Sequence, residues 1–218
     1  MIERKIFVTG GSNGLGRELV VQSKNRNINV NYHQRTNEQF LDGNFVFGDI
    51  KNHNTQKKII DSVIENDSNV FINNAGVYLN KPISETTIDE INEIISVNLL
   101  STIILTKEVL EIFKEKGHGM IYNINSLAGL NGSKFESVYC ASKHGLKGFT
   151  DSIKQEIRGN KNIRIVNVTL GAFKSKMTKS RDTYPYLSDV DDVANCILDH
   201  IQQDYNSIIS DLIITRNS

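Results

Sequence analysis

The sequence has no excess of charge of either sign. Its 218 residues include 25 Lys and Arg against 25 Asp and Glu, so the formal net charge at pH 7 is zero. Proteins that bind nucleic acids or anionic membrane surfaces usually carry a basic excess. The charge balance therefore gives no reason to expect nucleic acid, a membrane or a polyanionic substrate as a partner.

Long hydrophobic runs are also absent. No stretch approaches the roughly 18 consecutive apolar residues that a transmembrane helix needs. The N-terminal residues lead straight into a short apolar run, without the long apolar segment and small-residue cleavage site of a signal peptide. These absences predict a cytoplasmic protein.

Cysteine and proline are both rare. The two cysteines, Cys140 and Cys196, have no metal-ligand neighbours at a usable spacing, and no secretory signal suggests a disulfide. Pro82 and Pro185 mark no linker, and we find no low-complexity segment or internal repeat. A chain of this length can bury a sizeable core. We therefore predict one domain over residues 1–218, without a metal site.

Short apolar runs alternate along the chain with segments of helical periodicity, among them a long helix that a capping box at Thr87–Glu90 opens. Such alternation is typical of parallel strands joined by right-handed crossovers, which place helices on both faces of one sheet. Only residues 36–44 separate the second strand from the third, which leaves room for at most a turn or two of helix. We predict a Rossmann-like, doubly wound α/β fold with a mostly parallel sheet of seven strands, at Lys5–Thr9, Ile28–Tyr32, Phe45–Phe47, Val70–Asn73, Met120–Ile124, Ile163–Thr169 and Ile208–Ile214.

Ligands of such folds bind at the carboxyl edge of the sheet, so the residues after each strand are the candidates. A glycine-rich loop follows the first strand and opens a helix. Glycines let the backbone turn tightly and approach a phosphate, and the helix N-terminus presents free N–H groups to the anion. The spacing is T-G-x-x-x-G-x-G rather than G-x-G-x-x-G. We predict a dinucleotide-binding loop made of Gly10, Ser12, Asn13, Gly14, Leu15 and Gly16.

The end of the second strand bears on which cofactor binds. An acidic residue there would hold the free ribose 2′-hydroxyl of NAD(H), whereas an Arg favours the 2′-phosphate of NADP(H). No carboxylate stands at this position, and Arg35 can offer two N–H donors to a phosphate. The sequence therefore favours NADP(H), with NAD(H) as the alternative.

Tyr139 and Lys143 stand four residues apart, which places them on one face of a helix. A neighbouring ammonium stabilises a phenolate and lowers its pKa from about 10 toward neutral, so the phenol can exchange protons with a substrate. Ser126, after the fifth strand, could hydrogen-bond the same substrate oxygen. Asn98 lies inside the long helix, where its amide must find hydrogen-bond partners.

These motifs, together with Asn73-Asn74-Ala75-Gly76 after the fourth strand, resemble those of the short-chain dehydrogenase/reductase family in order and spacing. The resemblance implies that the helix kinks at an asparagine, which also holds a water that links the lysine to solvent. It implies a catalytic tetrad of Asn98, Ser126, Tyr139 and Lys143.

The same resemblance assigns further cofactor contacts. Lys143 is expected at the nicotinamide ribose, and Tyr139 is also expected to contact the cofactor. Asp49 and the Ile50 backbone are expected near the adenine, and Asn74, Ala75 and Gly76 near a cofactor ribose. From its position alone Asp49 could instead cap a helix, a role for which Asn52 and Asn54 also compete.

The segment after the sixth strand departs from the family's P-G-x-x-x-T pattern and is Leu170-Gly171-Ala172-Phe173-Lys174-Ser175. Ser175 keeps a hydroxyl that could reach the nicotinamide carboxamide, and Gly171 and Phe173 complete the predicted cofactor contacts. Residues 174–189 are expected to form a short substrate lid. Its basic start is typical of a solvated loop, or else indicates anionic substrates.

The sequence thus predicts an NADP(H)-dependent oxidoreductase that interconverts a carbonyl and a secondary alcohol on a small molecule. Two alternatives stay open: a cofactor-binding regulatory or scaffold protein, and an epimerase or dehydratase that uses transient oxidation. The long helix and the helix at Tyr139–Arg158 carry more apolar positions than one sheet face needs. Since members of the family pair these helices, we expect a homodimer or homotetramer.

Overall fold

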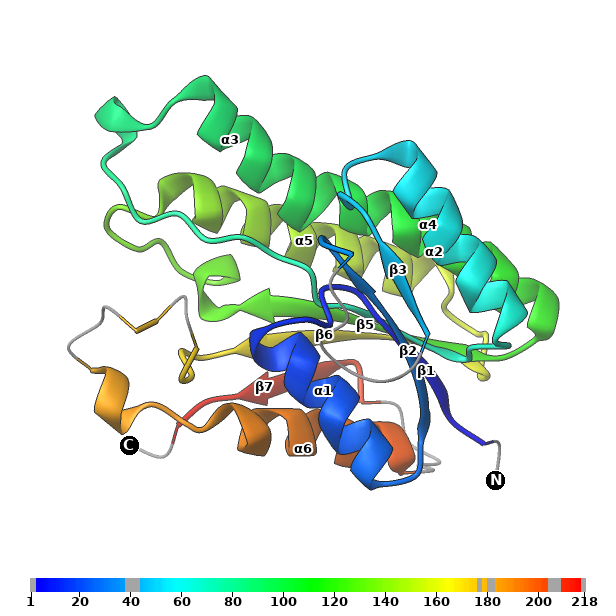
Figure 1. The fold of residues 1–218 in the computed structure, drawn as a ribbon. Coiled ribbons are helices and arrows are strands. Elements are labelled where there is room, and N and C mark those ends of the chain that lie inside the picture. Colours follow the sequence, from blue (N-terminus) through cyan, green and yellow to red (C-terminus); the bar gives the residue numbers. More distant parts are fainter. Residues whose placement is uncertain (1–2, 38–43, 176–177, 180–182, 204–208, 217–218) are drawn as a thin grey trace.

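The structure, a computed structural model, describes residues 3–37, 44–175, 178–179, 183–203 and 209–216, which form one sheet between two layers of helices (Figure 1). Within these residues the strands are β1 (Lys5–Val8), β2 (Asn29–Gln34), β3 (Phe45–Phe47), β4 (Val70–Asn73), β5 (Gly119–Ser126), β6 (Ile163–Leu170) and β7 (Asp211–Ile214). All neighbours are parallel, in the order β3-β2-β1-β4-β5-β6-β7. The order reverses between β1 and β4, so the predicted doubly wound, seven-stranded fold is confirmed.

Two strands extend two residues beyond their predicted ends, and β6 extends by one, to Leu170. β2 continues beyond Tyr32 because Gln34 pairs with Phe47 of β3, and β5 continues to Ser126, which pairs with Leu170 of β6. Polar side chains end the apolar runs in the sequence, but the backbone ladder continues through them. The predicted start of the seventh strand, at residue 208, and most of the crossover at residues 36–44 lie outside the described residues.

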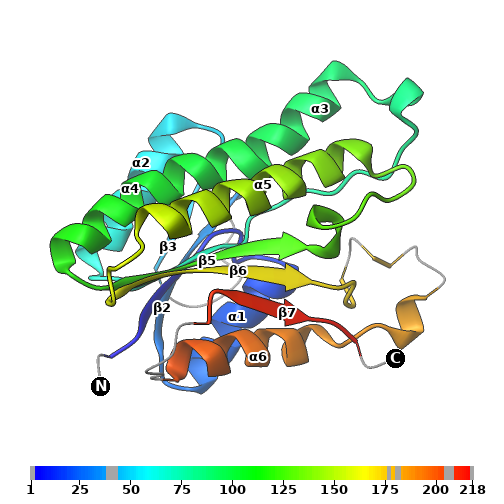
Figure 2. The ribbon, with the colours of Figure 1, turned by 180° about the vertical axis from the view of Figure 1, so that it is seen from behind.

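Helices α1 (Gly14–Asn25) and α6 (Val190–Gln202) cover one face of the sheet, and α2 (His53–Glu65), α4 (Ser101–Lys116) and α5 (Ser137–Glu156) cover the other (Figures 1 and 2). Successive side chains of a strand point to opposite faces. In β1, accordingly, Ile6 and Val8 join the core beneath α1 and α6, whereas Phe7 joins the core beneath α2 and α4.

The long helix predicted from Thr87 is built from three parts, α3 (Ile88–Ile95), a π-helical turn (Ser96–Leu100) and α4. Its capping box is confirmed: the Thr87 hydroxyl accepts from the Glu90 N–H at 3.2 Å, and the Glu90 carboxylate accepts from the Thr87 N–H at 2.8 Å. The π-helical turn contains Asn98. Single π turns inside α-helices occur frequently at functional sites.

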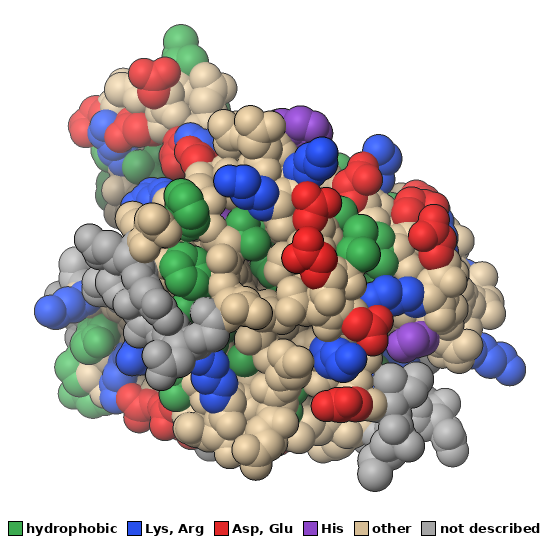
Figure 3. All heavy atoms as spheres, turned by 45° about the vertical axis from the view of Figure 1, so that its right-hand side comes forward, with side chains coloured by type: hydrophobic (Ala, Val, Ile, Leu, Met, Phe, Trp, Pro, Cys, Tyr) green, Lys and Arg blue, Asp and Glu red, His purple; other side chains and the backbone are tan. Residues whose placement is uncertain are grey.

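Basic and acidic side chains are interspersed on the face that Figure 3 shows. No helix within the described residues is long and apolar enough to cross a membrane. The same residues contain no group of three or more His, Cys, Asp or Glu side chains that could hold a metal ion.

Candidate active site

The glycine-rich loop is packed too closely for side chains at several positions. Gly10 has φ +71° and Gly14 has φ +52°, a region that L-residues rarely adopt. A Cβ atom on Gly16 would lie 2.1 Å from the Gly10 oxygen and 2.4 Å from Asn74 Nδ2. The first turn of α1 therefore rests directly on the end of β1, as a phosphate-binding loop requires.

Thr9 fastens this loop to the segment that follows β4. Its hydroxyl oxygen accepts from the backbone N–H groups of Asn74 and Ala75, both at 3.0 Å. The Asn74 amide in turn donates to the Thr9 oxygen at 2.9 Å and to the Gly10 oxygen at 3.3 Å. Hydrogen bonds thus join the glycine-rich loop, predicted to bind the pyrophosphate, to the segment 74–76, predicted to lie near a ribose.

The N-terminus of α1 fits an anion. Asn13 precedes the helix in an extended conformation, without a side-chain cap and, within this described helix, without an acidic residue in the first turn. Free N–H groups at a helix start carry a partial positive charge that binds phosphate. Ser12 is half-buried and Asn13 exposed at the mouth of the loop. The residues present therefore fit the pyrophosphate of a dinucleotide.

The expected adenosine contacts occupy neighbouring strand ends. Arg35 is exposed directly after β2, and Asp49 is exposed after β3, where its carboxylate accepts from the Lys51 N–H at 2.9 Å. Asn52, not Asp49, caps α2 by accepting from the Asn54 N–H at 2.8 Å. Ile50 is buried, and its oxygen accepts from Gln56 at 2.9 Å.

His33 is a buried member of this region that no sequence motif points to. Its Nδ1 accepts from the Gly10 N–H at 3.4 Å, and its Nε2 lies 3.0 Å from the Gly48 oxygen. These partners require a neutral ring with the proton on Nε2. Burial lowers the pKa of His33. Nothing in the local sequence marks this residue, because its partners lie far along the chain.

Lys143 is the basic residue of the candidate tetrad, and it is buried. Its side chain is 7% exposed, and Nζ donates to the Ile124 oxygen at 2.9 Å, on the strand that ends at Ser126. Burial lowers the pKa of Lys143 to about 8. The ammonium also lies 5.9 Å from the centre of the Tyr139 ring. The predicted pairing of these two side chains on one helix face is therefore present.

Asn98 uses its side chain to hold the segment after β4. Its Oδ1 accepts from the Val77 N–H at 2.8 Å, and its Nδ2 donates to the Val77 oxygen at 2.9 Å and to Ser142 Oγ at 3.2 Å. The π-helical turn makes this reach possible by displacing the backbone around Asn98. Gly76 lies beside it, since a Cβ there would be 3.4 Å from Asn98 Oδ1.

Ser126 is the last residue of β5, and Tyr139 lies in the first turn of α5. The Ser126 oxygen accepts from the Ala128 N–H at 3.2 Å, which uses a lone pair and not the hydroxyl proton. Tyr139 is half-buried, and its ring meets that of Tyr78 edge-on at 5.1 Å. The Tyr78 hydroxyl donates to the buried carboxylate of Glu136. No motif in the sequence points to Tyr78 or Glu136.

The segment after β6 is held by Thr178. Its hydroxyl donates to the Phe173 oxygen at 2.6 Å and accepts from the Ser175 N–H at 3.0 Å. Gly171 is fixed to β7, because its N–H donates to the Ile214 oxygen at 2.8 Å. In the expected lid, Lys174 pairs with Asp189 at 2.7 Å, which neutralises part of its basic start, while residues 176–177 and 180–182 lie outside the described residues.

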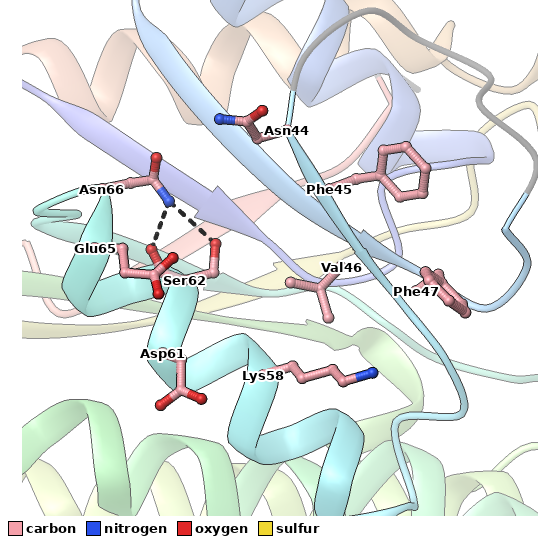
Figure 4. Close-up of a pocket in the computed structure, with 9 residues that line it drawn as sticks. All are labelled: Asn44, Phe45, Val46, Phe47, Lys58, Asp61, Ser62, Glu65 and Asn66. Carbon is pink, nitrogen blue, oxygen red and sulfur yellow. Dashed lines mark hydrogen bonds between the residues drawn. The ribbon is translucent and has the colours of Figure 1, made fainter.

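An open hollow of about 500 Å³ lies elsewhere, between β3 and α2 (Figure 4). Its lining includes Phe47, Lys58 and Asn66, and Lys58 lies over the Phe47 ring at 5.5 Å. β3 is an edge strand, separated from β5 by β2, β1 and β4. The hollow is therefore not part of the candidate tetrad.

Comparisons with known proteins identify the relatives of this chain. The family model described as short chain dehydrogenase matches residues 4–185. Dehydrogenase/reductase SDR family member 7 of Mus musculus is 27% identical in an alignment 217 residues long, which covers 92% of this chain and 62% of that protein. The human protein of the same name is matched over 57% of its length, so the chain spans about three fifths of these relatives.

Two solved structures extend the likeness to the whole fold. The structure of ElxO with NADP bound is 25% identical and has a TM-score of 0.85 over 98% of this chain and 97% of that chain. 4-Hydroxyisoleucine dehydrogenase complexed with NADH is also 25% identical, with a TM-score of 0.84 over 97% of this chain and 96% of that chain. Both contain a nicotinamide cofactor.

Proposed function

Because the chain belongs to the short-chain dehydrogenase/reductase family, we propose that it is an NADP(H)-dependent oxidoreductase that interconverts a carbonyl and a secondary alcohol on a small molecule. One observation carries this proposal: the buried Lys143 ammonium is fixed to β5 at 2.9 Å while lying beside the Tyr139 ring. A cation that is buried and held next to a phenol favours the phenolate, which is the property a tyrosine needs for acid–base catalysis near neutral pH.

In the proposed mechanism, the nicotinamide cofactor supplies or accepts the hydride when it is bound. During reduction, Tyr139 donates its phenolic proton to the substrate oxygen, and the Ser126 hydroxyl hydrogen-bonds the same oxygen. Lys143 stabilises the phenolate and holds the nicotinamide ribose. Asn98 holds the water through which Lys143 exchanges protons with solvent. In the oxidation direction Tyr139 takes the proton from the alcohol.

The preference for NADP(H) rests on the end of β2. Gln34 stands there without a negative charge, and its Nε2 donates to the Thr36 oxygen at 2.9 Å. Arg35 follows it and is exposed to an incoming phosphate. A carboxylate at this place would repel a 2′-phosphate, whereas a guanidinium binds it with paired hydrogen bonds. The remaining cofactor contacts proposed from the sequence lie along the same edge of the sheet.

A homodimer, or a tetramer built from it, is the proposed assembly. Leu100 is 50% exposed in the π-helical turn that precedes α4, on the helix layer that members of the family are expected to pair. Burying such a side chain against a symmetry mate removes apolar surface from water. Sedimentation at micromolar concentration tests this, and a clean monomer would exclude it. The cytoplasmic location is proposed from the sequence alone.

The decisive experiment is a screen of small carbonyl compounds in which NADPH absorbance is followed, with NADH in parallel. Once a substrate is found, Tyr139→Phe should lower turnover by about 10²–10⁴-fold while NADPH still binds, because only the general acid is lost. Tyr122→Phe is a matched control, since it removes a buried phenol hydroxyl that bonds His200 at 2.7 Å in the opposite core. Near-native turnover of Tyr139→Phe would refute the assignment.

A further inference from the structure

Glu136 is a buried carboxylate beside the candidate catalytic tyrosine. Its side chain is 7% exposed, and it immediately precedes α5. It stands three residues before Tyr139, at the N-cap position of α5. Burying a carboxylate costs free energy unless hydrogen bonds compensate it. Its position next to the proposed chemistry therefore needs an explanation that packing alone does not supply.

Tyr78 provides the compensating contact. Its hydroxyl donates to Glu136 Oε1 at 2.5 Å, and its ring stands at 82° to the ring of Tyr139 with the centres 5.1 Å apart. Edge-to-face packing of this kind is a favourable arrangement of two aromatic rings. One tyrosine thus contacts both the carboxylate and the catalytic phenol.

The segment that carries Tyr78 is fixed on both sides. Asn98 forms two hydrogen bonds with the backbone of Val77, at 2.8 and 2.9 Å, and the Lys81 N–H donates to the Phe135 oxygen at 2.7 Å. The segment 77–81, which carries Tyr78, is therefore attached to the π-helical turn at one end and to the residues just before α5 at the other. A rigid support of this kind can hold a catalytic side chain in its productive rotamer.

From these contacts we propose that Tyr78 and Glu136 are positioning residues for Tyr139, which hold its ring and oppose the electrostatic effect of Lys143 on its phenol. This proposal rests on the function proposed above. The Lys143 ammonium favours the Tyr139 phenolate, and the Glu136 carboxylate, which is bonded to the Tyr78 ring that packs on Tyr139, disfavours it. The balance of the two charges sets the pH at which Tyr139 exchanges its proton. Tyr78 fixes the distance between the Glu136 carboxylate and the Tyr139 ring, because its hydroxyl donates to the carboxylate and its ring packs against Tyr139.

Direct titration of Tyr139 tests the electrostatic part without any substrate. The chain has seven Tyr and no Trp, so the ultraviolet absorption of tyrosinate is readily followed, and the difference from Tyr139→Phe isolates one residue. Glu136→Gln keeps an oxygen that can accept from Tyr78 but removes the charge. We expect the Tyr139 midpoint to fall by about one pH unit, in accord with the usual effect of a nearby like charge on an acid. Glu156→Gln, at the exposed far end of α5, should leave the midpoint unchanged.

Kinetics test the positioning part. Tyr78→Phe keeps the ring but removes the hydroxyl that donates to Glu136, and we expect kcat to fall by roughly 10- to 100-fold with little change in KM, as for a small misplacement of a reacting group. Because the two residues act through one contact, the double variant should be no worse than the more impaired single variant. Additive effects, or an unshifted midpoint in Glu136→Gln, would overturn the proposal. If the midpoint shifts but no carbonyl compound is reduced, the proposed function fails while the pair stands.

Discussion

The Nζ atom of Lys143 lies 2.9 Å from the backbone oxygen of Ile124, on the strand that ends at Ser126. This one bond connects the middle of α5 with β5 and so fixes two members of the candidate tetrad relative to each other. It also holds an ammonium inside the protein, where burial lowers the pKa of Lys143 to about 8. The site therefore keeps a charged group at a cost to folding stability, and this cost depends on pH.

Replacing Lys143 by Met should remove that pH dependence. The unfolded chain binds this proton up to the ordinary pKa of 10.5 and the folded chain only up to about 8, so native stability rises between these values and the full penalty applies below pH 8. The difference in unfolding free energy between wild type and Lys143→Met should change by on the order of 3 kcal/mol across this window. Denaturant titrations from pH 7 to pH 10.5 measure it.

Two features make the Lys143 experiment specific. The variant lacks the hydrogen bond to Ile124 at every pH. This loss lowers its unfolding free energy by a constant amount and does not change how that free energy depends on pH. Lys147→Met serves as the control, because Lys147 lies one turn further along α5 and pairs with Asp151 near the surface. Parallel stability curves for wild type and Lys143→Met would contradict the predicted effect of burial. Turnover and cofactor affinity should both fall in Lys143→Met but not in the control.

Gly16→Ala should disrupt the cofactor loop. The added methyl group would lie 2.1 Å from the Gly10 oxygen, so the loop or the first turn of α1 has to move. Overpacking of this kind usually costs about 1–3 kcal/mol of stability, and here it should also weaken NADP(H) binding. Calorimetry and thermal unfolding report the two effects.

Gly148→Ala is the matched substitution for the loop experiment. Gly148 lies in α5, is exposed, and has nothing within 4 Å of the position that an added methyl group would take. Alanine in such a helix position should stabilise the protein by roughly 0.5–1 kcal/mol and leave cofactor binding unchanged. Equal behaviour of the two glycine variants would show that the loop is not closely packed.

The succession of strands and helices along the chain and the loop after β1 could be predicted because they depend on local patterns. Apolar runs, glycines and the Thr87 capping box each act over a few residues, and each was found where expected. The spacing of Tyr139 and Lys143 is likewise a property of one helix. The sequence therefore contained the fold class, while the catalytic roles of the site residues stay predictions.

Contacts between distant segments could not be predicted in the same way. Asn73 of β4 donates to Asn123 of β5 at 2.9 Å inside the sheet, although an isolated asparagine is usually a sign of a turn. The Tyr78–Glu136 bond joins residues 58 positions apart. Such partners are set by which strands become neighbours, which is known only once the fold is complete.

Arg35→Ala should change cofactor preference. Arg35 is the exposed cation after β2, so its loss should weaken NADP(H) binding by roughly 10-fold or more and leave NAD(H) binding nearly unchanged, as removal of a charge-assisted contact with one phosphate predicts. The loss should shrink at high salt because exposed charges are screened. Calorimetric titration with both cofactors measures this, and Arg158→Ala, at an exposed position two residues after the end of α5, is the control. Equal weakening of both cofactors would contradict the assignment.

His33 links the cofactor loop to the end of β3 through hydrogen bonds that require a neutral ring, and protonation at low pH removes this neutral form. Its ring accepts from the Gly10 N–H through Nδ1, and its Nε2–H donates to the Gly48 oxygen. Protonation of Nδ1 takes away the acceptor that Gly10 uses. Burial lowers the pKa of His33, while the Gly48 bond and the charge of Asp49 oppose that shift.

His33→Gln should therefore make stability less sensitive to acid. Because the folded pKa is below the ordinary 6.5, the unfolded chain takes up the proton first, and stability present above pH 6.5 is lost as the pH falls toward the folded pKa. Glutamine cannot titrate, so the unfolding free energy of the variant, measured by denaturant titration, should decrease less steeply than that of wild type as the pH falls below 6.5. Burial also lowers the pKa of His200. Its protonation therefore makes the same contribution to the pH dependence of the unfolding free energy in wild type and in His33→Gln. The control is His53→Gln, exposed at the start of α2, whose unfolding free energy should depend on pH as that of wild type does. If the unfolding free energy of His33→Gln falls as steeply as that of wild type, the Gly10 contact is not coupled to protonation.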